Sequence, residues 1–140
     1  MKKQVKKLLT SVMVLFLLLF AGFNTYCQDE IDIEIEIQVS PSTLNLNNSG
    51  QWVTVHTNIA YGSVLAASVK LDGVAISWSK FDNQGNFVAK FVIGDIKDLC
   101  IENDWLGPHE LTLTGVTKGD ETFSGTYEIN IINIIPVGKS

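Results

Sequence analysis

Residues 31–39 read I-D-I-E-I-E-I-Q-V and decide the fold class of this chain. Every second residue is an isoleucine or a valine, and the residues between them are acidic or carry an amide. A period of two places all the apolar side chains on one face, which is typical of a β-strand that buries one face. Pro41 follows and ends or bends the strand, because proline donates no hydrogen bond to a sheet.

Short β-type segments separated by turn residues make up the rest of the chain. Residues 51–57 (QWVTVHT) are rich in β-branched and aromatic residues, and residues 72–73 (D-G) form a two-residue hairpin turn. One short helical segment is expected at 94–101, with Asp95 as its N-cap, and a long final strand region at 122–135. The pattern predicts an all-β antiparallel sandwich of seven or eight strands.

The N-terminus has the layout of a secretory signal peptide. Residues 1–7 carry four lysines, residues 8–20 are apolar, and a more polar stretch follows. The apolar segment is shorter than the ~20 residues that span a bilayer. We therefore predict a signal peptide at 1–27 and one domain at 28–140, secreted or at the cell surface, with no membrane span in the mature chain. The alternatives are an uncleaved anchor helix and a lipid anchor on Cys27.

Composition excludes some classes of partner. The chain has 140 residues, with ten lysines, no arginine and fifteen acidic residues. Residues 28–140 keep six lysines and all fifteen acids, which is a formal charge of −9. Affinity for nucleic acid comes mainly from lysine and arginine that neutralise phosphates, so no nucleic-acid partner is expected. The length allows one domain.

The chemistry-bearing residues are scattered and form no catalytic motif. Cys100 lies between apolar residues and is expected in the core. His56 and His109 belong to separate segments and have no zinc-type spacing with cysteine. Asp82 opens the stretch D-N-Q-G-N, which is a weak calcium candidate, and the alternative is a hairpin turn. We therefore expect no enzyme activity and no cofactor.

Aromatic side chains are the first candidates for binding. Flat rings stack on sugar rings, and the candidate contacts are Tyr61, Trp78 and Trp105. The alternative is core packing, which we expect for Trp52 and Trp78 because they lie inside strand patterns. Trp105 lies in a loop with Gly-Pro, where both an exposed contact and a loop plug are consistent with the sequence.

The terminal strands are the second candidates. Residues 129–137 (INIINIIPV) are apolar on both faces, which suits a surface that docks another chain, a strand covered on both sides, or a bulge. Residues 31–39 present a clean apolar row that could complete the sheet of a neighbour. The candidates for self-association are Ile31, Ile33, Ile35, Ile37, Ile132 and Ile134.

The run IQVSPSTLNL at 37–46, followed by SGQWVTV at 49–55, resembles the opening of small Ig-like β-sandwich modules. Such modules occur in secreted and surface proteins of bacteria and archaea, often beside cellulosome-type or adhesive domains. The resemblance covers about residues 37–132. It implies an Ig-like sandwich with a spacer, adhesion or scaffold role. In similar modules the central turn carries several aspartates, whereas this chain has Asp82 alone, and this departure weakens the calcium inference further.

Together these observations predict a non-catalytic secreted or cell-surface subunit, structural or adhesive, which associates with itself through its terminal strands. The expected partner is a protein, in a homo-oligomer or filament, or an extracellular polysaccharide. The alternative function is a carbohydrate-binding accessory module.

Export of the full chain from a bacterial host tests the leader prediction. We expect a mature protein that begins at Gln28, because Thr25 and Cys27 are small enough for the positions that signal peptidase reads. Intact-mass spectrometry measures the outcome. A mass that includes residues 1–27, or a lipid attached to Cys27, would contradict it.

Overall fold

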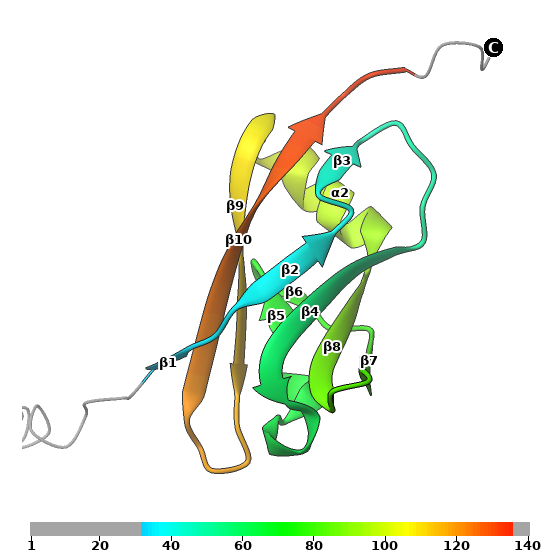
Figure 1. Ribbon diagram of the computed structural model, residues 1–140. Coiled ribbons are helices and arrows are strands. Elements are labelled where there is room, and N and C mark those ends of the chain that lie inside the picture. The colour runs from blue at the N-terminus through cyan, green and yellow to red at the C-terminus, as the bar shows by residue number, and fades with distance from the viewer. Residues whose placement is uncertain (1–31, 136–140) are drawn as a thin grey trace, which may run out of the picture. The chain divides into compact units, whose positions relative to one another are not determined.

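The structure of the chain is a computed structural model, and it describes residues 32–135. Within that range the chain forms strands, two 3₁₀ turns and an α-helix (Figure 1). In chain order these are β1 (Asp32–Glu34), β2 (Ile37–Ser40), β3 (Thr43–Asn45), β4 (Trp52–Ala60), η1 (Tyr61–Ser63), η2 (Ala66–Ser68), β5 (Lys70–Leu71), β6 (Val74–Ala75), β7 (Trp78–Phe81), β8 (Asn86–Val92), α2 (Ile93–Glu102), β9 (Gly107–Val116) and β10 (Thr122–Ile132).

The strands form two sheets, which confirms the predicted all-β sandwich. Sheet A has the order β1-β10-β9-β5-β6, and β3 also pairs with β10. Sheet B has the order β2-β4-β8-β7. The pairings are antiparallel except for β1 and β3, which both run parallel to β10. Among the described residues there are ten strands, more than the seven or eight expected, partly because the stretch predicted as one strand at 31–39 forms two.

The stretch predicted as one strand at 31–39 is divided between the two sheets. β1 pairs with β10 in sheet A, and β2 pairs with β4 in sheet B. Ile35 lies at the crossover, where its N–H donates to the carbonyl of Ser124 (2.8 Å). The period of two continues through the crossover, so Ile35, Ile37 and Val39 are all buried. The period of two predicts which side chains face inward, but it does not predict with which sheet the backbone of the segment pairs.

The predicted turns form as expected. Asp72 and Gly73 have φ of 45° and 86° and join β5 to β6, which is the positive-φ pattern of a two-residue hairpin turn. In the next hairpin, Oδ1 of Asp82 accepts the N–H groups of Gln84 (2.8 Å) and Asn86 (2.9 Å). The aspartate therefore closes its own turn, as Asp commonly does.

The helix α2 extends the predicted helical segment by one residue at each end. It buries Ile96 and Cys100, and its opposite side carries the exposed Asp95, Asp98 and Glu102. The prediction of Asp95 as the N-cap is wrong. Val92 occupies that position without a side-chain cap, and Asp95 lies in the first turn, where a carboxylate favours the helix dipole.

The inward faces of both sheets meet in one core. Most odd-numbered residues of β4 and β8 are buried from sheet B, and most odd-numbered residues of β9 and β10 are buried from sheet A. The ring of Phe123 lies against Gly115, its cross-strand partner, where an added Cβ would come within 2.3 Å of the ring. A glycine is needed there because the aromatic ring occupies the space of a side chain.

Gly125 of β10 is a second place where a side chain would not fit. A Cβ at this position would lie 2.8 Å from the carbonyl oxygen of Ile35 and 2.8 Å from Cγ2 of Ile37. The absence of a side chain therefore lets the β1–β2 crossover approach the last strand closely.

The variant Gly125→Ala tests this contact. We expect it to lower the free energy of unfolding by about 1–3 kcal/mol, because a new methyl group against a backbone carbonyl forces the crossover to shift. Urea unfolding of residues 28–140 measures the change. Gly62→Ala is the matched control, since a Cβ there meets nothing within 4 Å, and its effect should stay within about 0.5 kcal/mol. Equal stabilities for the two variants would contradict the prediction.

Candidate functional site

Trp78 lies on the outer face of sheet B and not in the core, which corrects the expectation of core packing. Its side chain is 43% exposed, and Trp52 beside it is half-buried. The two rings are 6.0 Å apart at 83°, an edge-to-face contact. Both residues sit at even-numbered positions of their strands, which point outward because Val53 and Val55 take the inward positions of β4.

Lys90 joins this pair from the neighbouring strand. Its Nζ lies 5.6 Å from the centroid of the Trp78 ring and donates to Oγ1 of Thr54 (2.8 Å). An ammonium placed near an indole is attracted by the negative face of the ring. The outer face of sheet B therefore holds a cation and two indoles in fixed relation.

Tyr61 lies at the other end of β4, apart from this pair. It is 37% exposed, and its ring stacks on the buried Phe87 (5.8 Å, 22°). Its edge meets Phe81 (5.6 Å), which is 67% exposed. One side of the Tyr61 ring is thus used for packing.

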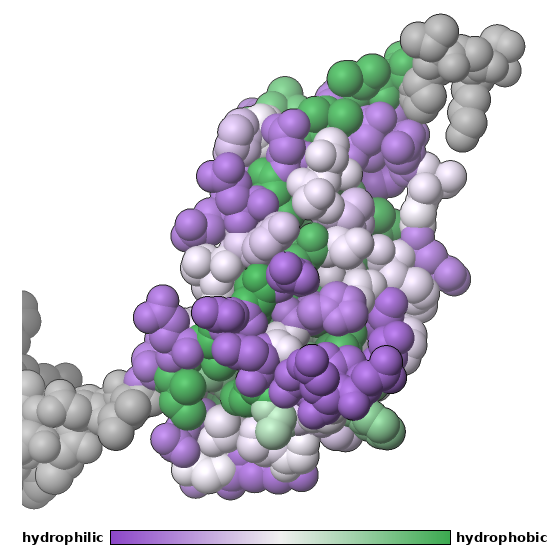
Figure 2. Space-filling view, in the orientation of Figure 1, coloured by the Kyte–Doolittle hydropathy of each residue, from purple (hydrophilic) through white to green (hydrophobic). Residues whose placement is uncertain are grey.

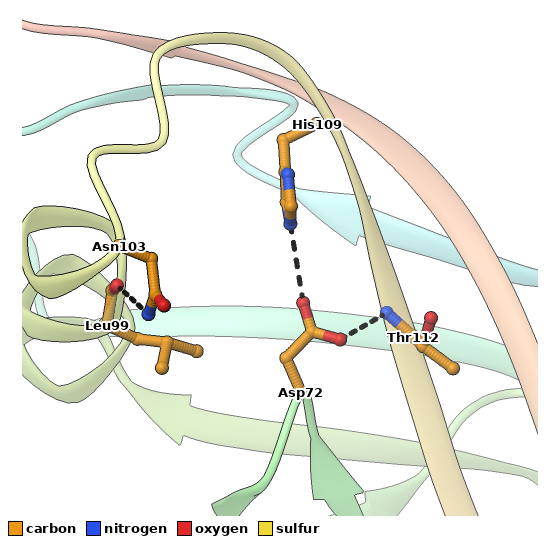
Figure 3. A network of polar contacts seen from close by, with 5 residues as sticks. All are labelled: Asp72, Leu99, Asn103, His109 and Thr112. Carbon is orange, nitrogen blue, oxygen red and sulfur yellow. Dashed lines mark hydrogen bonds and ion pairs between the residues drawn. The ribbon is translucent and has the colours of Figure 1, made fainter.

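Trp105 belongs to a third group, between α2 and β9. Its ring is half-buried, packs against the core and stacks on His109 (3.8 Å, 22°). Nε2 of His109 lies 3.7 Å from Oδ2 of Asp72, whose Oδ1 accepts the N–H of Thr112 (3.1 Å), as Figure 3 shows. The stacked histidine covers one face of the indole, so Trp105 closes its loop onto β9. The three candidate aromatics lie in separate places and do not form one platform.

Cys100 lies on the inner side of α2, and its burial in the core was correctly predicted. It is 1% exposed, and burial together with the negative charge of Asp72 raises the pKa of its thiol. A nucleophilic cysteine requires the opposite, a lowered pKa in an electropositive site. The arrangement of Cys100, His109 and Asp72 therefore favours a structural thiol.

The metal candidate Asp82 uses Oδ1 to close its own turn, and its neighbours in the D-N-Q-G-N stretch carry no charge. Within residues 32–135 there is no group of three or more His, Cys, Asp or Glu side chains that could hold a metal ion. His56 and His109 lie on β4 and β9, in different sheets. None of the helices in the described part of the chain is long and apolar enough to cross a membrane.

The isoleucines proposed for self-association have different environments. Ile35 and Ile37 are 7% and 6% exposed and belong to the core of their own domain, and Ile33 packs against that core. Ile132 is half-buried, and Ile134 is 57% exposed. Ile31 lies outside the described residues. In Figure 2 the surface over the end of β10 is hydrophobic, where Ile134 and Ile135 are exposed.

A groove of about 500 Å³ lies beside the β1–β2 crossover. Its walls are residues 34–38, residues 56–58 of β4, and Thr126 and Tyr127 of β10. The groove forms because the chain moves away from β10 after β1 and returns to it only at β3. The part of β10 between these two pairings therefore has no strand beside it on that side within the described residues. The strand edges beside this groove are uncovered, which the sequence pattern did not indicate.

Main-chain groups of β10 are open at this groove. The carbonyl of Ser124 accepts the N–H of Ile35, and the N–H of Asn130 donates to the carbonyl of Ser42, just before β3 (2.8 Å). Even-numbered residues of β10 therefore point their main-chain groups away from β9. Between those two bonds, Thr126 and Glu128 have no main-chain partner on this side within residues 32–135.

The outer edge of β2 is open in the same way. The N–H of Asn58 donates to the carbonyl of Glu36 (3.2 Å), so even-numbered residues of this segment point toward β4. The main-chain groups of Ile37 and Val39 point to the opposite side, where no partner lies among the described residues.

Comparison with protein-family models, with curated proteins and with solved structures found no match to this chain. The resemblance to Ig-like modules therefore rests on the sequence motifs at 37–55 and on the later strands, and it stays a prediction.

Thiol labelling tests the placement of Cys100. In residues 28–140, which contain this single cysteine, we expect Ellman's reagent to react at least ~100-fold more slowly than in urea, because access requires local opening. A Cys100→Ala, Ser49→Cys variant is the control, since residue 49 is exposed and its thiol should react at once. Comparable rates for the two native proteins would contradict a buried thiol.

The raised pKa of Cys100 also determines the direction in which the stability of the domain changes with pH. Above the range where a free thiol ionises, the unfolded chain loses this proton while the folded chain keeps it. The free energy of unfolding should therefore fall with rising alkaline pH, and Cys100→Ala should remove that part of the fall. Urea unfolding of both proteins across this range measures the difference. Parallel pH profiles would contradict the expectation.

Proposed function

We propose that this chain is an exported, non-catalytic Ig-like module that acts as a structural or adhesive subunit at the cell surface. The strand order supports the Ig-like assignment. Sheet B, β2-β4-β8-β7, corresponds to the A-B-E-D sheet of immunoglobulin domains, and β10-β9-β5-β6 corresponds to G-F-C-C′. The disulfide that joins strands B and F in antibody domains has no counterpart, because Cys100 lies on α2 and is free.

The open strand edges are the observation that carries an assembly role. Ile37 and Val39 on β2, and Thr126 and Glu128 on β10, present main-chain donors and acceptors at these edges, and Ile37 and Thr126 line the same groove. An open edge is a template for a strand of another chain, and backbone hydrogen bonds supply the affinity in such complexes. We infer that the occupant is a strand from a second copy.

The side chains around the edges restrict how copies join. Asp32, Glu34 and Glu36 are exposed beside the edge of β2, and Glu128 is exposed on β10. Like charges that face each other across a strand pair destabilise the pairing, so registers that align these carboxylates are disfavoured. The charges thereby favour a limited assembly over uncontrolled stacking of sheets.

A carbohydrate-binding role is the second candidate. The observation that favours it is the exposed Trp78, with Lys90 and Trp52, on the outer face of sheet B. Trp78 lies on β7, at the edge of this sheet opposite to the open edge of β2.

Amide exchange at increasing concentration tests the assembly. In residues 28–140 we expect association by light scattering, with slower exchange at the amides of Ile37, Val39, Thr126 and Glu128, because a new strand would accept their hydrogen bonds. The amide of Tyr127 is the internal control, since it faces β9 in every state. A protein that stays monomeric over two decades of concentration, with those four amides exchanging fast throughout, would overturn this part of the proposal.

A further inference from the structure

The outer face of sheet B carries its side chains at even-numbered positions of β2, β4, β8 and β7. The strand register sets them in rows. One row runs Ser40, Thr54, Lys90, Trp78, and Trp52 lies in the next row opposite Val92. This face is defined as the even positions within 38–40, 52–56, 78–80 and 86–92, and it is called the B face below.

The centre of the B face is packed although this face points outward. Val88 lies at its centre with 0% exposure, yet it belongs to this side of β8 and lies outside the main core cluster. Lys90 is half-buried and held by Thr54 and by the ring of Trp78. Because Lys90 and Trp78 already hold each other in place, a ligand that contacts these two side chains orders little on binding.

The charge of the B face differs in sign from that of the domain. Residues 32–135 hold five lysines and thirteen acidic residues, a formal charge of −8. The B face holds Lys80 and Lys90 and no acidic residue. A cationic face on an acidic domain selects an anionic ligand and positions it on that face.

We propose that the B face binds an acidic polysaccharide, one whose sugar units carry carboxylates. The exposed ring of Trp78 offers a flat apolar surface to the C–H face of a sugar ring, Lys90 and Lys80 pair with carboxylates, and Gln38 and Thr54 supply hydrogen-bonding groups for hydroxyls. Nucleic acid fits less well, because phosphate affinity rises with the number of cations and this face has two.

This proposal deepens the carbohydrate-binding candidate above and rests on it, but it is independent of the proposed self-association, and the two fail separately. The open edge of β2 and the ring of Trp78 lie on opposite edge strands of sheet B. A monomer that binds an acidic polysaccharide would refute assembly and keep this proposal, and an oligomer without affinity for the polysaccharide would do the reverse.

Titration of residues 28–140 with polygalacturonate tests the proposal, and fully methyl-esterified polygalacturonate is the matched ligand without charge. We expect the acidic polymer to quench or shift tryptophan fluorescence and to bind at least ~10-fold more tightly than the ester, because each lysine–carboxylate pair adds charge-assisted hydrogen bonding. Binding of the acidic polymer should weaken as salt increases.

Three variants identify the face. Trp78→Ala should weaken binding at least ~10-fold, the scale of one lost aromatic stacking contact. Lys90→Gln should weaken it several-fold and flatten the salt dependence. Leu106→Ala is the control, because Leu106 is 62% exposed but lies between α2 and β9, and it should bind as the parent does. Thermal unfolding confirms that each variant is folded.

Three results would overturn the proposal. The first is a folded parent protein with no affinity for polygalacturonate. The second is equal binding of the acidic polymer and its ester. The third is unchanged binding by the folded Trp78→Ala variant, which would place any affinity elsewhere on the domain.

Discussion

The sandwich depends on the contact between residues 32–40 and the strands on either side of them. Ile35, Ile37 and Val39 are 7%, 6% and 3% exposed, and each such side chain stabilises the fold by about 1.5–3 kcal/mol. Together they contribute an upper limit of roughly 5–9 kcal/mol, which is comparable with the whole net stability of a typical domain. Gly125 makes this possible, because the crossover approaches β10 where a methyl group would collide.

The same crossover leaves main-chain groups open. A segment that changes sheets uses its side chains to close the core between them, but its backbone can pair with one sheet at a time. Between β1 and β3, therefore, the edge of β10 is bare, and β2 presents its own outer edge beside the groove. Burial of the apolar row and exposure of the edges have one cause, and for that reason the proposed association is placed at the first and last strands.

Local patterns were sufficient to predict much of this fold. The inward alternation of residues 32–39, the Asp72-Gly73 turn and the helix near residue 94 each depend on neighbours in sequence, and each is present in the structure. The division of 31–39 between two sheets depends on partners about 20 and 90 residues away, so periodicity carried no signal for it. Trp78 was expected in the core because its strand was recognised, but its orientation follows from the register with β8, which the sequence alone leaves open.

The positions of charge and apolar surface explain how one small domain can serve two kinds of contact. Carboxylates gather beside the edges of β1 and β2, where they would limit the proposed pairing between copies, and the lysines Lys80 and Lys90 lie on the B face. Strand addition at an edge extends a sheet in its own plane, so it leaves the outward side chains of that sheet uncovered. Copies joined at β2 would therefore present their B faces side by side. A row of weak sites for one polymer gains affinity through effective concentration, so assembly and polysaccharide binding would reinforce each other without any new contact.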